Sequence, residues 1–174
     1  MIQQIVIEPK QYRDLVERLV TQTARQLPDV DLVVGIIRGG FYPADTLSRA
    51  LRLPWAYLYV QSYDADEHNT GEIRFGRELS GQKPERGQTV LVVDDLVDSG
   101  QTLVKTMEWF DAHYHDYELN FKTAVIWKKA CATFEPDLFV QEIPFIEGTN
   151  ECPWIIQAHE QEAARIGQSL GLKA

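Results

Sequence analysis

One stretch of this chain, residues 90–103, constrains its fold more than any other. It reads VLVVDDLVDSGQTL, so four apolar residues run directly into two adjacent carboxylates, Asp94 and Asp95. The valine-rich run over 90–93 predicts a buried strand. Apolar residues then recur at helical spacing, and these are Leu103, Val104, Met107 and Phe110. We therefore expect a strand, a short polar turn and a helix near 101–113, which is the building unit of a parallel sheet.

The polar turn of this unit is suited to binding an anion. A helix start presents free backbone N–H groups and the positive end of the helix dipole. The hydroxyls of Ser99 and Thr102 add donors, and Gly100 lets a ligand approach the backbone closely. The carboxylates at the strand end suit a different partner, either sugar hydroxyls or a hard cation. Together these residues predict a sugar-phosphate ligand.

A plainer interpretation is a surface turn whose acids only cap the helix, with Asp98 as the N-cap. Two neighbouring carboxylates argue against it. Like charges ~4 Å apart repel by about 4 kcal/mol at an effective dielectric constant of roughly 20. A chain that clusters them is therefore expected to bind a cation or hydroxyl groups there.

Residues 90–103 resemble the phosphoribosyl-pyrophosphate (PRPP) motif of the type I phosphoribosyltransferases, especially that of the 6-oxopurine branch. The resemblance implies that Asp94 and Asp95 hold ribose hydroxyls and Mg²⁺, and that Asp98 is the general base at purine N7. The implied PRPP-binding turn comprises Asp98, Ser99, Gly100, Gln101 and Thr102. The implied reaction joins PRPP to guanine, xanthine or hypoxanthine, giving a nucleoside 5′-monophosphate and pyrophosphate.

A second glycine turn follows the predicted strand 32–37. Its sequence, GIIRGGFYPA over residues 35–44, is similar to the pyrophosphate loop of the same family. The resemblance assigns Arg38 and Gly39 to pyrophosphate and implies a cis peptide bond between them. A diphosphate needs a tight backbone turn with N–H donors and a nearby cation. The alternative is an ordinary Gly-Gly turn between a strand and a helix.

The resemblance places purine-binding residues at two positions. Lys128 follows the apolar run 124–127 and matches the family lysine that donates to O6 of a 6-oxopurine. Its neighbour Lys129 leaves this register open by one residue. Trp154 resembles the aromatic residue that stacks on the purine, and the main-chain carbonyl of Ile155 would accept from a 2-amino group.

The C-terminal segment near 141–160 is similar to the small hood that covers the base in this family. Glu160 matches a carboxylate that helps a second metal ion or pyrophosphate. Residues 158–159 are Ala-His, where close relatives often have Pro-Trp. This departure leaves open an enzyme that uses a different base.

A polar, glycine-punctuated stretch covers residues 61–87. Such a stretch inside a compact domain is usually functional or mobile. The resemblance places the flexible catalytic loop here, opened by Ser62 and Tyr63, as a lid that excludes water from a reactive ribosyl cation. The alternative is a disordered insertion.

The remaining pattern predicts a single α/β domain over 1–174, with a parallel sheet flanked by helices. Further strands are expected at 55–60, 121–127 and 138–140. Further helices are expected at 9–27, from Pro43 onward and at 163–170. Ligands of such sheets bind at the carboxyl ends of the strands. Both glycine turns fall at such ends.

Composition excludes several classes of function. A net charge of −9 argues against a general nucleic-acid surface. Two cysteines are too few for a disulfide scaffold, and no apolar run reaches transmembrane length. The start of the chain lacks the basic and apolar regions of a secretion signal, so a cytoplasmic protein without membrane or nucleic-acid partners is expected. The resemblance further implies a homo-oligomer, either a dimer or a tetramer. The main rival is a non-catalytic protein that senses PRPP.

Overall fold

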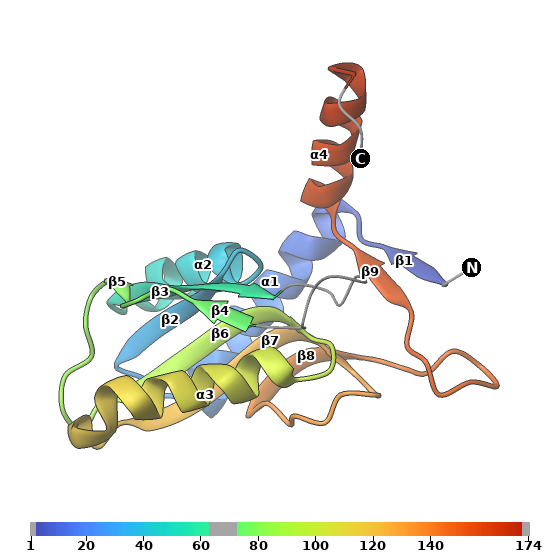
Figure 1. Cartoon of the computed structure of the whole chain (residues 1–174). Coiled ribbons are helices and arrows are strands. Elements are labelled where there is room, and N and C mark those ends of the chain that lie inside the picture. Colours follow the sequence, from blue (N-terminus) through green and yellow to red (C-terminus); the bar gives the residue numbers. More distant parts are fainter. Residues whose placement is uncertain (1–2, 63–72, 172–174) are drawn as a thin grey trace.

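The computed structural model describes residues 3–62 and 73–171 and has an α/β fold (Figure 1). Its main sheet has seven strands in the order β4-β3-β2-β6-β7-β8, with β5 paired to β3. The strands are β2 (Leu32–Ile37), β3 (Trp55–Ser62), β4 (Ile73–Phe75), β5 (Ser80–Gly81), β6 (Thr89–Val97), β7 (Asn120–Lys129) and β8 (Leu138–Ile143). Every pair from β3 across to β8 is parallel. The fold class expected from the sequence is confirmed.

Helices cover both faces of this sheet. α1 (Pro9–Gln26) and α2 (Phe41–Leu51) lie on one face, while α3 (Gln101–Tyr114), extended by the short 3-10 helix η1 (His115–Tyr117), lies on the other (Figure 1). Successive side chains of β2 point into two different cores. Val33 packs with α1 and α2, whereas Leu32 and Val34 pack with α3. Burial on both faces explains why the central strands are almost wholly apolar. Among the described helices, none is long and apolar enough to cross a membrane.

β6 is longer than the sequence indicated. The predicted strand over 90–93 stopped before the acidic pair, but β6 continues through Asp94 and Asp95 to Val97. Pairing with β7 extends it, because Leu96 lies opposite Trp127 and Val97 lies opposite Lys128. The acidic pair is therefore held in the sheet, and the turn into α3 consists only of residues 98–100.

A second sheet has two strands and contains part of the segment that the sequence assigned to the hood, so we refer to it below as the hood. β1 (Gln4–Val6) pairs in parallel with β9 (Trp154–Ile156), so the amino terminus of the chain contributes to it. Residues 141–143 of the segment expected as the hood near 141–160 belong to β8, in the main sheet. It also includes β1, which the sequence did not indicate. α4 (Ala158–Ser169) follows β9, starts before the predicted residue 163 and projects from the body of the molecule (Figure 1).

The polar stretch over 61–87 contains more order than an irregular loop. β4 and β5 both fall within it, and both pair antiparallel with β3. Backbone pairing thus fixes residues 73–75 and 80–81, which the sequence assigned to a single flexible loop. Ser62 ends β3, and Tyr63 lies outside the described residues.

Candidate active site

The two glycine turns meet at one edge of the sheet. β2 and β6 are parallel neighbours with Gly35 opposite Val93, so their carboxyl ends coincide. A Cβ atom at Gly39 would collide with the Asp95 carboxylate, and one at Gly40 would lie 2.7 Å from the Ile36 carbonyl oxygen. Only glycine allows this approach. The expected cis peptide bond is present one bond earlier than expected, between Ile37 and Arg38.

Arg38 lies at the open end of this turn. It follows β2 directly, and its side chain is exposed. It has no ion-pair partner among the residues that the structure describes. An exposed guanidinium beside a tight turn is suited to a diphosphate, because its planar fork matches phosphate oxygens.

The acidic pair carries a strong local field. Asp94 is only 8% exposed, and its Oδ1 accepts a 2.9 Å hydrogen bond from the backbone N–H of Asp95. Burial, and then the charge of Asp95, raise the pKa of Asp94 well above its ordinary value. The pKa of the buried Tyr12 hydroxyl is also raised, first by burial and then by Asp95. A cation or sugar hydroxyls at this position would relieve the crowding of negative charge.

Residues 98–100 form the turn between β6 and α3, which we call the phosphate turn, and neighbouring residues hold it in place. Gly100 has φ +94°, and a Cβ atom there would also run into Phe134. The Ser99 carbonyl accepts hydrogen bonds from the N–H and the hydroxyl of Thr133, at 3.1 and 2.9 Å. Asp98 and Ser99 are exposed, and α3 starts at Gln101 with Thr102 in its first turn. The first N–H groups of α3 therefore lie directly after the exposed residues of this turn, and a helix start of this kind can bind an anion.

Lys129, and not Lys128, reaches Asp98. The Lys129 ammonium lies 2.9 Å from Asp98 Oδ2, and its side chain is only 5% exposed. It also lies over the Trp154 ring, 5.4 Å from the ring centroid. The sequence assignment to Lys128 is therefore not supported by this geometry.

Lys128 lies on the other side of β7. Its ammonium pairs with Glu135 at 2.6 Å and with Glu142 at 3.5 Å, over the ring of Phe139. Neighbouring residues of a strand point to opposite faces of the sheet. A shift of the register by one residue would therefore exchange the surroundings of Lys128 and Lys129. The apolar run before the two lysines does not reveal which one faces the site.

Trp154 and Ile155 both belong to β9. Trp154 is 48% exposed although it belongs to a strand. Its N–H bonds to the Gln3 carbonyl, and Ile156 accepts from Ile7 N–H, both at 2.9 Å. In a parallel ladder alternate residues bond to the partner strand. The backbone groups of Ile155 therefore point away from β1, toward the open edge of β9.

Gln157 links the hood to the acidic pair, a role that the sequence analysis did not predict. Its side-chain Nε2 donates a hydrogen bond to Asp95 Oδ2, and the side chain is buried. Its Oε1 is buried without a hydrogen-bond partner in the described structure. The backbone N–H of Gln157 donates to Glu160 Oε2 at 2.9 Å. Glu160 therefore supports Gln157 at the start of α4 instead of reaching the acidic pair as a ligand.

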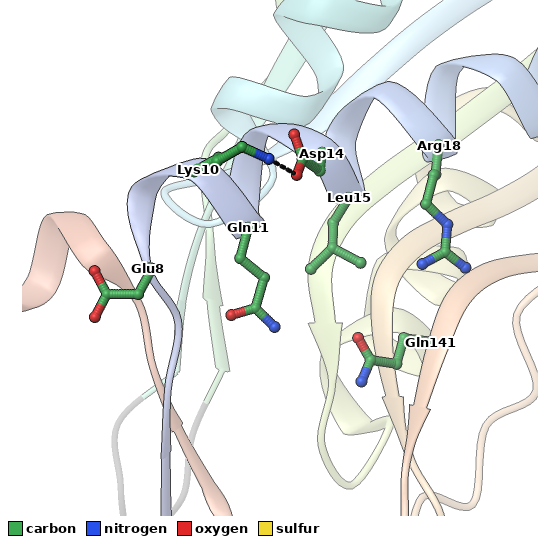
Figure 2. A pocket seen from close by; sticks show the side chains of 7 residues that line it. All are labelled: Glu8, Lys10, Gln11, Asp14, Leu15, Arg18 and Gln141. Carbon is green, nitrogen blue, oxygen red and sulfur yellow. Dashed lines mark hydrogen bonds and ion pairs between the residues drawn. The ribbon is translucent and has the colours of Figure 1, made fainter.

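A shallow hollow between α1 and β8 lies apart from these residues. Figure 2 shows its lining side chains, which come from α1 and the segment before it and from β8. They are Glu8, Lys10, Gln11, Asp14, Leu15, Arg18 and Gln141, around a volume of about 440 Å³. Lys10 and Asp14 pair with each other at 2.8 Å (Figure 2). None of the residues discussed above lines this hollow.

Comparison with known proteins identifies the arrangement. The phosphoribosyl transferase domain matches residues 7–157, which is most of the chain. The chain belongs to this family. A hypoxanthine-guanine phosphoribosyltransferase of Dictyostelium discoideum is 29% identical over 136 residues, covering 74% of this chain and 73% of the relative.

Solved structures agree on the phosphoribosyltransferase fold. A purine phosphoribosyltransferase from Pyrococcus horikoshii superposes with a TM-score of 0.70 at 22% identity, over 90% of this chain and 94% of the other. A xanthine-guanine-hypoxanthine phosphoribosyltransferase from Helicobacter pylori superposes with a TM-score of 0.72 at 21% identity, over 95% and 99%. The phosphoribosyltransferase therefore has the family architecture over almost its full length.

The metal ligands expected in this phosphoribosyltransferase are not all brought together. Among the described residues, no three Asp, Glu, His or Cys side chains gather closely enough to hold a metal ion. Asp94 and Asp95 still offer adjacent carboxylate oxygens, the donor type that Mg²⁺ prefers. The raised pKa of Asp94 means that an added positive charge there would be favourable. These two residues fit a metal whose other ligands come from a bound phosphate ligand.

Proposed function

We propose that this protein transfers the 5-phosphoribosyl group from PRPP to a 6-oxopurine in purine salvage. One observation carries the proposal: Asp98 and Lys129 form a 2.9 Å pair beside the phosphate turn and under the Trp154 ring. A carboxylate and an ammonium side by side form a pair of acceptor and donor. Such a pair complements N7–H and O6, which are adjacent on a 6-oxopurine.

The ribosyl donor would bind across the two turns. The backbone N–H groups at the start of α3, with Ser99 and Thr102, would hold the 5′-phosphate. Arg38 and the turn at Gly39 would hold the pyrophosphate, and Asp94 and Asp95 would accept hydrogen bonds from ribose hydroxyls. These parts lie on three adjacent segments of one sheet edge, so a single PRPP molecule could contact all of them.

Mg²⁺ would be held by Asp94 and Asp95 together with oxygens of PRPP. When bound, it supplies positive charge that stabilises the leaving pyrophosphate. The residues of this chain would contribute the rest. Arg38 would share the neutralisation of the leaving group, and Gln157 would hold Asp95 in place through its Nε2–Oδ2 hydrogen bond.

The base would lie against Trp154. Asp98 would accept the proton from N7, Lys129 would donate to O6, and the Ile155 carbonyl would accept from a 2-amino group. Because Lys129 is a donor only, it would lose its hydrogen bond against the 6-amino group of adenine. That loss costs about 1–3 kcal/mol, which corresponds to roughly 5- to 150-fold discrimination.

A panel of bases tests this proposal. Purified protein is given PRPP and Mg²⁺ with hypoxanthine, guanine, xanthine or adenine, and pyrophosphate release is measured. We expect turnover with one or more 6-oxopurines and little with adenine. A preference for adenine, or no release with any of the four bases, would rule the proposal out.

Two matched variants locate the base-recognition lysine. Lys129→Met should raise KM for the 6-oxopurine about 10- to 100-fold and narrow the gap to adenine. Lys128→Met should change KM little, since Lys128 pairs with Glu135 and Glu142. A larger rise in KM for Lys128→Met than for Lys129→Met would assign recognition of the base to Lys128.

We further propose a cytoplasmic homo-oligomer. Large aromatic side chains at the start of α2 and on β3 are exposed: Phe41, Tyr42 and Tyr59 are each 45–48% exposed. Phe41 also contacts the Trp55 ring, with centroids 5.7 Å apart. Exposed aromatic side chains of this size favour contact with a second copy. Light scattering of the eluting protein should give a mass above that of one chain, and Phe41→Glu should lower it.

A further inference from the structure

The two cysteines of the chain come together beside the site, although 21 positions (152 − 131) separate them in the sequence. Cys131 lies in the turn closed by the 3.0 Å hydrogen bond from Ala132 N–H to the Lys129 carbonyl. Cys152 lies two residues before Trp154. The Ile143 carbonyl oxygen contacts both segments. It accepts a hydrogen bond from Ala130 N–H at 2.8 Å, next to Cys131, and it lies 3.8 Å from Cys152 Sγ.

The two thiols also contact each other. Both side chains are partly exposed and neither is in a disulfide. Burial, and then the side-chain hydrogen bond to Cys152, raise the pKa of the Cys131 thiol. Cys131 therefore stays a protonated thiol at neutral pH. Two adjacent thiols with solvent access are the starting geometry for an intramolecular disulfide.

From this placement we propose that Cys131 and Cys152 form a reversible disulfide that closes the base-binding side of the site. The proposal rests on the proposed function for its effect on base use, but not for formation of the bond. The bond would join the turn after β7 to the segment that enters β9. It would therefore connect the backbone beside Lys129 to the backbone beside Trp154.

The chemistry requires a peroxide as the oxidant. The Cys152 thiol loses its proton, the thiolate attacks a peroxide oxygen and the O–O bond breaks, which leaves a sulfenic acid on Cys152. The hydroxide or alkoxide that leaves takes up the lost proton as water or an alcohol. The Cys131 sulfur then displaces the sulfenic hydroxyl, and its thiol proton leaves with that group as water. Two electrons pass from the thiols to the peroxide. A small thiol reverses the bond by exchange.

The disulfide would lock the contact between Lys129 and Trp154 and so hinder binding of the base. The Lys129 ammonium lies over the Trp154 ring, on the face where a base would stack. A base that stacks on this side of the ring would need the hood strand and Lys129 to move apart. A disulfide brings its sulfurs to about 2 Å and ties these two segments together. The disulfide would not involve the phosphate turn or the first residues of α3, so the predicted PRPP-binding residues 98–102 would stay unchanged.

The test compares reduced and peroxide-treated wild-type protein. Because the chain has two cysteines, thiol titration should fall from two to none, and a non-reducing peptide map should show Cys131 joined to Cys152. KM for the 6-oxopurine should rise about tenfold or more, with PRPP binding by calorimetry unchanged. Dithiothreitol should restore the original KM.

Serine variants provide the matched controls. Cys131→Ser and Cys152→Ser should each have the reduced enzyme's KM before and after peroxide. Free thiols after treatment, or only intermolecular links, would overturn the proposed disulfide. A mapped link with unchanged KM would overturn its effect on the base. If the link forms but no 6-oxopurine is used in either state, the proposed function fails while the disulfide stands.

Discussion

Asp94 illustrates at the residue scale how a candidate binding site opposes the stability of its own fold. Its carboxylate is buried beside a second carboxylate, and the resulting rise in its pKa means that the folded protein holds a proton more tightly than the unfolded chain. This contribution to stability is fully present below the unfolded pKa of about 4. It is lost as the pH rises through the higher pKa of the folded state. At neutral pH the ligand-free protein therefore bears the cost of a buried charge.

Asp94→Asn should raise the melting temperature of the ligand-free protein at neutral pH. Asn has no charge to bury, yet keeps an oxygen for the Asp95 N–H. We expect a gain of about 2–4 °C, the shift that 1 kcal/mol gives in a chain of this size. The gain should shrink as the pH falls toward 4, which calorimetry can follow. The exposed Asp111→Asn is the control, and an equal gain in that variant would contradict the assignment.

Asp98→Asn should separate binding from chemistry. The backbone donors of the phosphate turn remain, and Asn keeps an oxygen for Lys129, so PRPP affinity should stay near that of the wild type. Turnover should fall about 10²- to 10⁴-fold, the usual contribution of a positioned proton acceptor. Steady-state kinetics and PRPP calorimetry measure the two effects, and wild-type turnover would remove Asp98 from the base role.

At the element scale, short connections decide the geometry of the site. Three residues join β6 to α3, and this turn is held from outside by Thr133 and Phe134. A second connection, the Gln157–Asp95 hydrogen bond, holds the start of α4 and the end of β9 against β6. Neither β9 nor α4 belongs to the main sheet. The hood is therefore positioned by a few specific contacts, and such contacts can change when a ligand binds.

Gly100→Ala should impair both the fold and the phosphate turn. The positive φ of Gly100 and the collision with Phe134 act together, so a loss of about 2–4 kcal/mol in unfolding free energy is expected, along with weaker PRPP binding. Gly148→Ala is the matched control, since Gly148 has φ +77° but no atom within 4 Å of its added Cβ. It should cost only about 1 kcal/mol. Chemical denaturation of both variants tests this, and equal losses would exclude the contact with Phe134 as a cause.

At the scale of the whole molecule, the site is assembled from the carboxyl ends of β2, β6 and β7 and from the separate hood. A ligand that contacts all of these elements should stabilise the entire fold. The net charge of −9 and the acidic pair also mean that a polyanion such as PRPP needs added positive charge to bind there.

PRPP and Mg²⁺ should therefore stabilise the protein together and not separately. At about 100 times the dissociation constant the gain is roughly 2.7 kcal/mol, or a rise of about 5–10 °C in melting temperature. PRPP with EDTA, or Mg²⁺ alone, should give a much smaller rise. If PRPP in EDTA raised the melting temperature as much as PRPP with Mg²⁺ does, Asp94 and Asp95 would take part in PRPP binding without a metal ion.

The sequence by itself determined the parts of this protein whose physics is local. Valine-rich runs predicted the central strands, helical spacing predicted α1 and α3, and residues 90–103 indicated a sugar-phosphate site. These inferences need only neighbours along the chain. Strand ends were less certain, since the extension of β6 to Val97 depends on pairing with β7.

Only the tertiary structure decided which distant residues face one another. The choice of Lys129 over Lys128 depends on which face of β7 meets Asp98, and the apolar residues before it permit either register. The bond between Asp95 and Gln157, the pairing of β1 with β9 and the contact of Cys131 with Cys152 each join segments that are far apart in sequence. No local preference encodes such contacts. They follow from the path of the whole chain, which is set by burying both faces of the sheet at once.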